Sequence, residues 1–339
     1  MKCVKIVDTK KFELSEVENP ISKDGSVVIK VNSCGICGSD IHYWVSGQIK
    51  NLVMGHEFAG TVIDNGARTD LKPGDRVTGL PISPCFKCDA CRTGNVQYCK
   101  GTWTNAVGLS MTYPGAYAEY TSVHPEMVKR IPDNVTDDEA CMVEPSAVSL
   151  HAVNLADIRV GAKVLIVGGG IIGLMAAEFA KLNGATYIAL LETNEKRGKK
   201  SLTYGYVDEY YDALDQNTVP TLVKKTNGGF DVVIECCGSS PAVTEAIMSV
   251  RNGGTIVLVG VSLTPITIPT VVSVMGEVKM QGAIAYTEKE FEDCLNLISE
   301  KKINVKKYID DKVPLSEAQK SFERLTSGTD DAIKIIFKP

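Results

Sequence analysis

The amino-acid sequence predicts a two-domain α/β protein, in which a mainly antiparallel β domain precedes a parallel, doubly wound α/β domain. The 339 residues exceed the size at which a single hydrophobic core keeps growing. Up to about residue 150, short alternating runs are separated by glycine and proline, which is typical of a loop-rich β domain. From Gly161 onward, apolar strands alternate with amphipathic helices, which indicates a parallel sheet.

The first domain contains four runs with the alternation expected of half-buried strands. They are Ser26–Val31, Phe58–Ile63, Arg76–Gly79 and Ala118–Val123. Turn-forming residues separate these runs, for example Gly66, Pro73-Gly74 and Pro114-Gly115. Short strands between such turns predict a compact antiparallel sheet.

The second domain begins with a continuous apolar strand, Lys163–Val167, which is followed by a glycine-rich turn. The next helix ends near Asn183-Gly184, where the glycine can cap it. The later predicted strands are Tyr187–Leu191, Val232–Cys236 and Thr255–Gly260, and the later helices are Glu195–Leu202, Val219–Thr226 and Ala242–Val250. This alternation predicts strand–helix–strand units.

The tail after about residue 285 has a less certain place in the fold. It contains two predicted helices, Glu288–Glu300 and Leu315–Thr326, and a closing strand, Ala332–Lys338. Periodicity alone leaves open whether the tail extends the parallel sheet or returns to the first domain.

The composition is that of an ordinary globular protein with an acidic balance. Hydrophobic residues make up 44% of the chain, the net charge is −5 and the pI is near 5.6, so we expect no nucleic-acid partner. The longest apolar stretch, Val164 to Ala177, contains four glycines and is shorter than the ~20 residues that span a bilayer, so we expect no membrane partner. The first residues lack the apolar region of a signal peptide. Together with an odd cysteine count of 11, this predicts a cytoplasmic protein.

Four cysteines form one cluster with the spacing C-x2-C-x2-C-x7-C. They are Cys85, Cys88, Cys91 and Cys99. A tight turn can direct their thiolates at one ion at Zn–S distances near ~2.3 Å, and four thiolates leave zinc no open position. Buried inert thiols are the alternative, but the polar neighbours Lys87 and Asp89 indicate an exposed loop. The cluster therefore predicts a structural zinc site. A zinc-finger-like nucleic-acid module is disfavoured, because no recognition-helix pattern follows Cys99.

The run Gly168-Gly169-Gly170-Ile171-Ile172-Gly173 satisfies G-x-G-x-x-G. A glycine-rich turn that binds no ligand can have the same sequence. Here, however, a strand precedes the turn, a helix follows it and an acidic residue ends the next strand, which is the context of a dinucleotide-binding turn. Gly168 permits the tight turn, Gly170 lets the backbone approach a pyrophosphate, and Gly173 lets helix and strand pack closely. The pyrophosphate would lie at a helix N-terminus, which favours anions. The second domain is thus predicted to be a Rossmann dinucleotide-binding domain.

Glu192 indicates which dinucleotide binds. It lies about 20 residues after the turn, where a carboxylate accepts hydrogen bonds from the adenosine ribose and repels the extra phosphate of NADP. NAD is therefore expected, with NADP as the alternative because Lys196 and Arg197 lie nearby. The cofactor site is also expected to include Ile171, Ile172, Arg197, Cys237 and Val259.

A second set of metal-ligand residues would leave a coordination position open. Its members are Cys37, His56, Glu57 and Glu144. One cysteine, one histidine and one or two carboxylates leave zinc room for a water or a substrate oxygen, as a catalytic site requires. A lone histidine is more often a core or surface residue, but His56 follows a glycine and precedes an acid just before a strand. Glu144 has apolar neighbours, where an unpaired charge is costly.

Six segments in this order carry a family resemblance. They are GICGSDIH from Gly35, GHE-x2-G-x5-G from Gly55, the four-cysteine loop, GAYAEY from Gly115, Glu144-Pro145 and the GGGIIG turn. Together they resemble the zinc-dependent medium-chain dehydrogenases of the alcohol dehydrogenase superfamily, over essentially the whole chain. The Cys37–Trp44 run and Glu144 are similar to the polyol (sorbitol and xylitol) dehydrogenase branch. Liver-type alcohol dehydrogenases instead carry a cysteine at the position of Glu144.

The resemblance implies a GroES-like catalytic domain at residues 1–150, with a structural-zinc lobe at about 81–105. It further implies a Rossmann domain at 151–285 and a return to the catalytic domain at 286–339. By the same resemblance, Cys37 and His56 ligate the catalytic zinc, while Glu57 or Glu144 ligates it directly or through water. Asp40 is implied to orient His56.

The resemblance also implies a mechanism in which zinc polarises a hydroxyl as a Lewis acid and hydride passes to the nicotinamide. Ser39 is expected to take the hydroxyl proton and His42 to pass it to water. The residues expected to wall the substrate pocket are Tyr43, Trp44 and Phe58. One departure from the family pattern is Arg68, which stands in a shortened turn where an aliphatic residue is common.

We therefore expect an NAD- and zinc-dependent dehydrogenase that oxidises a secondary hydroxyl of a polyol or vicinal diol to a ketose or ketone. The alternative substrates are sugar-alcohol phosphates, 2,3-butanediol and L-threonine. A non-catalytic NAD-binding regulator is the alternative of another class, although it would have no use for an open zinc site. The resemblance implies a homodimer or homotetramer.

Overall fold

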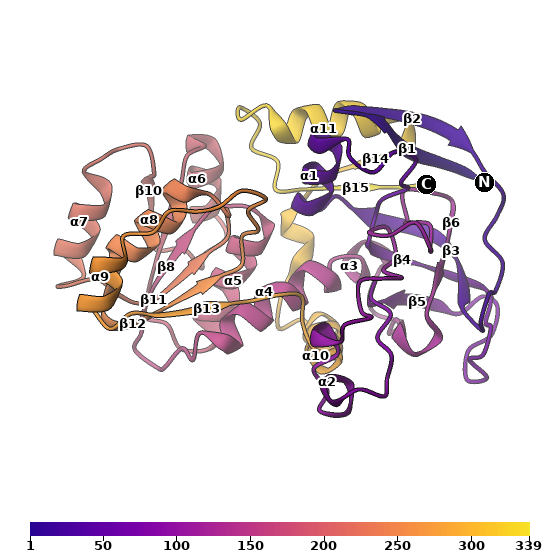
Figure 1. Cartoon of the computed structure of the whole chain (residues 1–339), viewed down its shortest axis with the longest axis horizontal. Coiled ribbons are helices and arrows are strands. Elements are labelled where there is room, and N and C mark those ends of the chain that lie inside the picture. Colours follow the sequence, from indigo (N-terminus) through magenta and orange to yellow (C-terminus); the bar gives the residue numbers. More distant parts are fainter. The chain divides into compact units, whose positions relative to one another are not determined.

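The computed structural model describes residues 1–339, and the chain divides into two compact units. The first unit consists of Met1–Ala147, Tyr286–Gly328 and Lys334–Pro339. The second consists of Val148–Ala285 and Thr329–Ile333. Periodicity left the place of the tail open, and the structure puts most of it in the first unit. Figure 1 shows its yellow elements α11, β14 and β15 among the elements of that unit.

A seven-stranded sheet forms the centre of the first unit, with the order β14-β15-β3-β4-β5-β7 and with β6 paired to β3. Its strands are β3 (Val27–Gly35), β4 (Glu57–Asp64), β5 (Arg76–Gly79), β6 (Tyr120–Val123), β7 (Val128–Arg130), β14 (Ile309–Val313) and β15 (Lys334–Phe337). Only β14 and β15 pair in parallel. The mainly antiparallel fold predicted from the alternating runs is therefore confirmed.

A separate hairpin and several short helices complete the first unit. The hairpin consists of β1 (Lys2–Asp8) and β2 (Lys11–Glu16). The helices are α1 (Gly38–Ser46), α2 (Asp89–Arg92), α3 (Asp137–Ala140), α10 (Glu288–Ser299) and α11 (Ala318–Thr326), with 3-10 turns at Val96–Tyr98, Pro125–Met127, Val305–Tyr308 and Leu315–Glu317. Trp44 of α1 packs against Phe12 and Phe322, with ring centroids 6.0 and 5.5 Å away. This aromatic cluster fixes α1, whose first residues carry the site described below.

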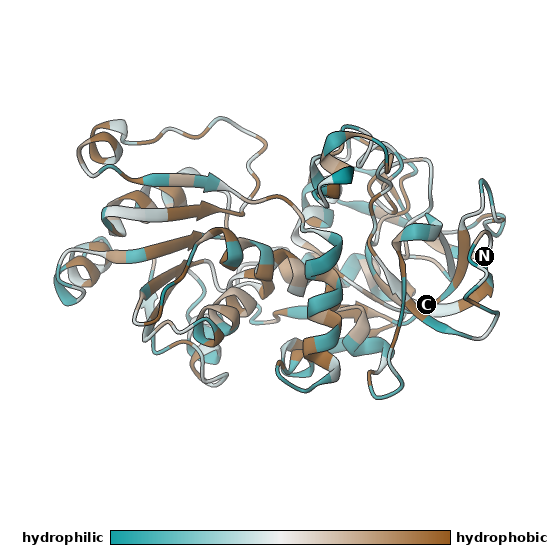
Figure 2. Cartoon of the chain, turned by 90° about the horizontal axis from the view of Figure 1, so that it is seen from below, coloured by the Kyte–Doolittle hydropathy of each residue, from teal (hydrophilic) through white to brown (hydrophobic).

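The second unit contains a six-stranded sheet in which every pair is parallel, with the order β10-β9-β8-β11-β12-β13. Its strands are β8 (Lys163–Val167), β9 (Tyr187–Glu192), β10 (Glu209–Asp212), β11 (Phe230–Glu235), β12 (Val250–Leu258) and β13 (Lys279–Gly282). The central strands are almost entirely buried. They are also mostly hydrophobic, and Figure 2 shows the strands of this unit largely in brown. Such continuous apolar strands are expected in a parallel sheet covered on both faces.

Helices alternate with these strands. They are α5 (Ile171–Leu182), α6 (Glu195–Leu202), α7 (Thr218–Lys225), α8 (Ser240–Ser249) and α9 (Thr270–Met275), and α4 (Val143–Leu155) leads the chain from the first unit into the second. Leu222, Val243 and Ile247 pack onto Leu165 and Val233 in the core between helices and sheet. The doubly wound parallel fold predicted from sequence is confirmed. None of the helices combines the length and apolarity that crossing a membrane requires.

Candidate active site and metal centres

Two adjacent strand ends bring three of the predicted catalytic-zinc residues together. β3 and β4 pair antiparallel with Gly35 opposite Glu57, so Cys37, just beyond β3, comes close to His56, just before β4. One ligand atom from each of Cys37, His56 and Glu57 lies within 4.8 Å of the other two. His56 and Glu57 are buried and Cys37 is half-buried. A convergent cysteine, histidine and carboxylate is a donor set that zinc binds, with a fourth position left open.

Asp40 holds both Cys37 and His56 in place. Cys37 is the N-cap of α1, and its backbone N–H donates to Asp40 Oδ2 over 3.1 Å. Asp40 Oδ1 lies 3.4 Å from His56 Nδ1, and the hydroxyl of buried Tyr117 donates to Asp40 Oδ2 over 2.6 Å. Burial alone would lower the pKa of His56, but Asp40 and Cys37 outweigh it and raise that pKa well above its ordinary value. The contact directs Nδ1 to Asp40 and leaves Nε2 for a metal.

Glu57 forms an ion pair that is almost completely excluded from water. Its Oε2 lies 2.5 Å from Nζ of Lys334, and the two side chains are 1% and 0% exposed. Lys334 also donates to the carbonyl oxygen of Ile36 over 2.7 Å. Gly35 makes room for this pair, because a Cβ there would lie 2.0 Å from Glu57 Oε2. The other oxygen of Glu57, Oε1, is buried without a hydrogen-bond partner, as expected for an atom that can ligate a metal.

Lys334 is a functional candidate that the sequence reasoning missed. It lies at the start of β15, which pairs with β3. Burial alone would lower its pKa, but the carboxylate of Glu57 raises it above the ordinary value, so the side chain stays charged. The available signal was a lysine within the apolar run Ala332–Phe337, where an unpaired charge is costly.

Glu144, near the start of α4, is held by a different partner. The hydroxyl of Tyr286 donates to its Oε1 over 2.9 Å, and both side chains are buried. Burial raises the pKa of Glu144 to about 7, although the nearby His56 lowers it. Glu144 is not part of the group whose ligand atoms all lie within 4.8 Å of one another. The two candidate glutamates thus have distinct environments, and Tyr286 is a second residue that sequence reasoning missed.

Ser39 and His42 both lie on α1. The Ser39 hydroxyl donates to Cys37 Sγ over 3.3 Å, which places it beside the candidate metal position. His42 is exposed and lies about one helical turn further along. Of the residues expected to wall a pocket, Trp44 and Phe58 are 2% and 1% exposed and belong to the hydrophobic core. Core packing accounts for these two aromatic side chains.

The four-cysteine loop forms a second metal-ligand cluster. The Sγ atoms of Cys85, Cys88, Cys91 and Cys99 all lie within 4.8 Å of one another. Burial opposes ionisation of Cys99, but the backbone N–H groups of Cys85 and Gly101 point at its sulfur over 3.4 Å and lower its pKa to about 6. Backbone N–H groups of Lys87 and Cys88 likewise lower the pKa of Cys85. Four converging sulfurs, two of them with lowered pKa, fit a closed tetrahedral zinc site.

The glycine-rich turn has the geometry of a dinucleotide site. Gly168 has φ of 102°, in the left-handed region, and Gly170 is the N-cap of α5. A Cβ at Gly173 would lie 2.0 Å from the carbonyl oxygen of Gly168, so only glycine allows this packing of helix on strand. Ile171 and Ile172 start α5 and are half-buried. Free N–H groups at this helix N-terminus can bind a pyrophosphate.

Glu192 lies at the end of β9, beside the turn. Its Oε2 accepts a hydrogen bond from the Gly169 N–H over 2.8 Å, and Arg197 Nη1 lies 3.6 Å from the same oxygen. Cys237 and Val259 lie just beyond the ends of β11 and β12, on the far side of β8 from Glu192. The predicted cofactor residues therefore follow the carboxyl ends of four neighbouring strands, where dinucleotides bind in open parallel sheets.

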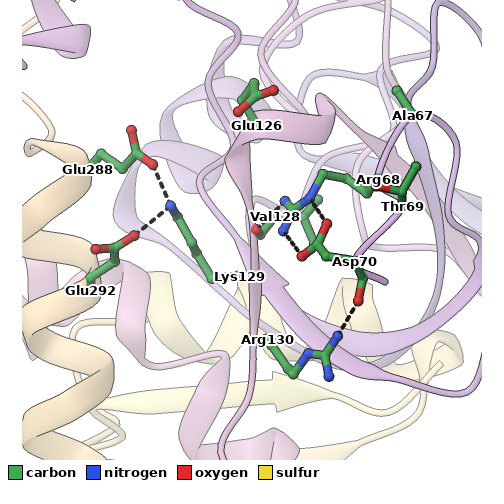
Figure 3. A pocket seen from close by; sticks show the side chains of 10 residues that line it. All are labelled: Ala67, Arg68, Thr69, Asp70, Glu126, Val128, Lys129, Arg130, Glu288 and Glu292. Atoms are coloured by element: carbon green, nitrogen blue, oxygen red, sulfur yellow. Dashed lines mark hydrogen bonds and ion pairs between the residues drawn. The ribbon is translucent and has the colours of Figure 1, made fainter. Parts of the chain in front are cut away.

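A surface cavity of about 480 Å³ in the first unit has no lining residue in common with either metal cluster. Five of its charged side chains already pair with one another: Arg68 with Asp70 over 2.7 Å, and Lys129 with Glu288 and Glu292 (Figure 3). A ligand would have to break these pairs, so we assign no substrate to this cavity. Arg68 also donates to the carbonyl oxygens of Pro125 and Val128, which gives the unusual arginine of this turn a structural role.

Comparisons with known proteins place these features in a family. Residues 23–133 match the family model for the alcohol dehydrogenase GroES-like domain, and residues 172–300 match the model for zinc-binding dehydrogenases. The chain is 31% identical to a D-xylulose reductase from Saccharomyces cerevisiae, over 97% of this chain and 95% of the relative. It is also 31% identical to a sorbitol dehydrogenase from Gallus gallus, over 94% of this chain and 91% of that protein. Among solved structures, the 2R,3R-butanediol dehydrogenase from Bacillus subtilis superposes with a TM-score of 0.87 at 28% identity, covering 100% of this chain and 99% of the other.

Proposed function

The chain belongs to the zinc-binding alcohol dehydrogenase family, and we propose that it oxidises a secondary hydroxyl of a polyol or vicinal diol with NAD⁺ as the hydride acceptor. The product is the corresponding ketose or ketone. Relatives named for D-xylulose and sorbitol, and a structural relative named for 2R,3R-butanediol, support this substrate class. We assign the catalytic residues to the first unit and cofactor binding to the second, and the domain limits 1–150, 151–285 and 286–339 stay a prediction.

The observation that carries the proposal is the buried convergence of Cys37, His56 and Glu57. A binding protein without catalytic activity has no need of a cysteine–histidine–carboxylate set with an open position, since structural zinc sites are closed. Zinc bound there supplies Lewis-acid chemistry that makes a hydroxyl more acidic. Glu57 is our candidate third ligand because its Oε1 has no other partner. Glu144, held by Tyr286, remains available to contact water or substrate.

The residues of α1 provide the path for the proton that the alcohol loses. The Ser39 hydroxyl donates to Cys37 Sγ, so the lone pairs on its oxygen are free to accept a hydrogen bond from the substrate hydroxyl. His42 is exposed, and an imidazole can both accept and donate a proton, so it can exchange that proton with water. Asp40 and Tyr117 keep His56 fixed while this happens, because both contacts are buried. Lys334 offsets the negative charge of Glu57.

The other two sites have separate roles. Cys85, Cys88, Cys91 and Cys99 hold a structural zinc, and all four belong to one loop segment. In the second unit, the turn that binds the pyrophosphate is formed by Gly168, Gly170 and Gly173. The carboxylate of Glu192 accepts hydrogen bonds from the hydroxyls of the adenosine ribose. The carboxylate of Glu192 favours NAD over NADP because the additional phosphate would meet a like charge.

The surface of the second unit supports a homodimer or homotetramer. β13 is an edge strand whose residues are all exposed, so its free backbone groups can pair with a second strand. Next to it in sequence, Val271, Val274 and Met275 are 74%, 75% and 79% exposed. Large apolar side chains gathered beside an open sheet edge favour association. Eleven cysteines without a disulfide suit the reducing cytoplasm, where we locate the protein.

The experiment that tests the proposed function is an NAD⁺-reduction panel with and without a chelator. It covers pentitols, hexitols, their phosphates, 2,3-butanediol and L-threonine, with the Cys37→Ser variant as control. We expect chelator-sensitive NADH formation with an unphosphorylated polyol or diol, and none in the variant. Activity confined to phosphates or threonine would overturn the substrate class. NADH binding without turnover of any compound would favour a non-catalytic regulator instead.

A further inference from the structure

Glu235 is a buried acid in the second unit that plays no part in the proposed chemistry. It is the last residue of β11, and its side chain is completely buried. One carboxylate oxygen, Oε2, has no hydrogen-bond partner in the protein. A buried carboxylate with an unsatisfied oxygen costs stability, so its presence calls for a compensating role.

The other carboxylate oxygen of Glu235 organises the turn that follows β11. Oε1 accepts hydrogen bonds from the backbone N–H groups of Cys237 and Gly238, over 2.6 and 2.8 Å. Bonds from two amides to one carboxylate oxygen are charge-assisted and therefore stronger than ordinary ones. These two hydrogen bonds fix the conformation of the turn, because they tie its backbone to the side chain of Glu235, which comes just before it in sequence.

The backbone of Glu235 organises a second turn, the one that follows β12. Its carbonyl oxygen accepts hydrogen bonds from the N–H groups of Val259 and Gly260, over 2.8 and 3.0 Å. The two turns touch closely, because a Cβ at Gly260 would lie 2.0 Å from the backbone nitrogen of Gly238. A shift of either turn would therefore displace the other.

The same region touches the glycine-rich turn. Cys237 Sγ lies 3.5 Å from the carbonyl oxygen of Val167, and a Cβ at Gly168 would lie 2.5 Å from that sulfur. Glu235 thus stands at the junction of three turns, which follow the neighbouring strands β8, β11 and β12. All three leave the carboxyl edge of the parallel sheet, where the cofactor binds.

The strand order indicates which half of the cofactor these turns meet. Glu192, the residue for the adenosine ribose, ends β9, and β8 lies between β9 and β11. A dinucleotide spans the crevice where the direction of strand order reverses, with its pyrophosphate at the turn after the first strand. With the adenosine over β9 and the pyrophosphate over β8, the nicotinamide half lies over β11 and β12.

We propose that Glu235 is a positioning residue for the nicotinamide half of the cofactor, acting through the turns at Cys237–Gly238 and Val259–Gly260. It does not touch the cofactor. It fixes the conformation of the backbone that contacts the nicotinamide and its ribose. The nicotinamide is therefore held in one position when it accepts the hydride. The inference rests on NAD binding by the second unit and is independent of which alcohol is oxidised.

The test separates the two halves of the cofactor by using ligands of different length. ADP ends at the pyrophosphate, whereas NADH extends over β11 and β12. Affinities of both are measured by titration calorimetry for the full-length parent, Glu235→Ala and the milder Glu235→Gln. Glu192→Ala is the matched control for the adenosine side.

In Glu235→Ala we expect NADH to bind at least about tenfold more weakly, the scale of losing one hydrogen bond to a charged group, with ADP affinity unchanged. In Glu235→Gln, which keeps one accepting oxygen, we expect a smaller loss confined to NADH. Glu192→Ala should weaken both ligands.

Equal weakening of NADH and ADP in Glu235→Ala would show a merely structural role and overturn the proposal, as would unchanged NADH affinity. If the alanine variant does not fold, an unchanged NADH-to-ADP affinity ratio in Glu235→Gln overturns it instead. A parent protein that binds neither ligand would refute the proposed function itself, which is a distinguishable result.

Discussion

Replacing Lys334 with methionine tests whether the metal-site glutamate depends on a buried counter-charge. Methionine is similar in length and apolar, so Lys334→Met removes the ammonium group while filling much of the same volume. Glu57 Oε2 then loses its partner at 2.5 Å, and the carbonyl oxygen of Ile36 loses its donor at 2.7 Å. Because the two side chains are 0% and 1% exposed, water cannot replace either contact.

The magnitude follows from this burial. Removing one partner of a buried ion pair leaves an uncompensated charge and costs about 3–5 kcal/mol. Leaving the Ile36 carbonyl unsatisfied adds about 1 kcal/mol, so the free energy of unfolding should fall by about 4–6 kcal/mol in the zinc-free protein. Zinc at the site would compensate Glu57 in part, so the loss should be smaller in the zinc-loaded protein.

Urea unfolding followed by tryptophan fluorescence measures this loss, since the protein's two tryptophans, Trp44 and Trp103, both lie in the first unit. Lys338→Met is the matched control: its ammonium pairs with Asp138 over 2.7 Å but its side chain is 42% exposed, so its loss should not exceed about 1 kcal/mol. The double variant Lys334→Met/Glu57→Gln should recover at least half of the stability, because a neutral amide needs no counter-charge. If Lys334→Met is no less stable than the control, or the double variant recovers nothing, the charge-compensation argument is refuted.

Three further predictions concern the metal clusters and Glu144. Cys37→Ser should abolish NADH formation while NADH still binds, as monitored by cofactor fluorescence; turnover by a metal-checked sample would contradict the catalytic-zinc assignment. Cys91→Ser should remove one zinc per chain and lower the melting temperature by about 5 °C or more, equivalent to about 2 kcal/mol in a domain of this size; an unaltered melting temperature with full zinc would argue against a structural role. Because burial raises the pKa of Glu144 from 4.5 to about 7, the folded zinc-free protein retains a proton that the unfolded chain releases. Its stability relative to Glu144→Gln should therefore fall as the pH rises from 4.5 to 7, and parallel pH–stability curves for the two proteins would exclude this linkage.

The features that could be predicted from sequence are those with local signals. β8 and α6 have the predicted bounds because apolar runs, the N-cap Asn194 and the flanking turns lie within each segment. The four-cysteine cluster could be found because its ligands are close in sequence. The polar hairpin β1–β2 was missed, since β2 is mostly exposed and has no clear apolar alternation.

The partners of the two glutamates could not be predicted, because they come from distant parts of the chain. Lys334 is 277 positions from Glu57 and reaches it only through the pairing of β15 with β3. Tyr286 is 142 positions from Glu144. Local propensity carries no information about such contacts. The sequence alone therefore left open which glutamate ligates the metal, whereas their different partners now support a division of roles.

The central claim is that a zinc ion at Cys37, His56 and Glu57 is required for oxidation of an alcohol by NAD⁺. The most direct measurement is the rate of NADH formation from the best substrate as the zinc bound per chain is varied, first by chelation and then by adding zinc back. We predict that the rate disappears as the bound zinc falls from two ions to one, and that it returns when zinc is restored. An undiminished rate in protein whose Cys37 cluster has lost its zinc would contradict the account.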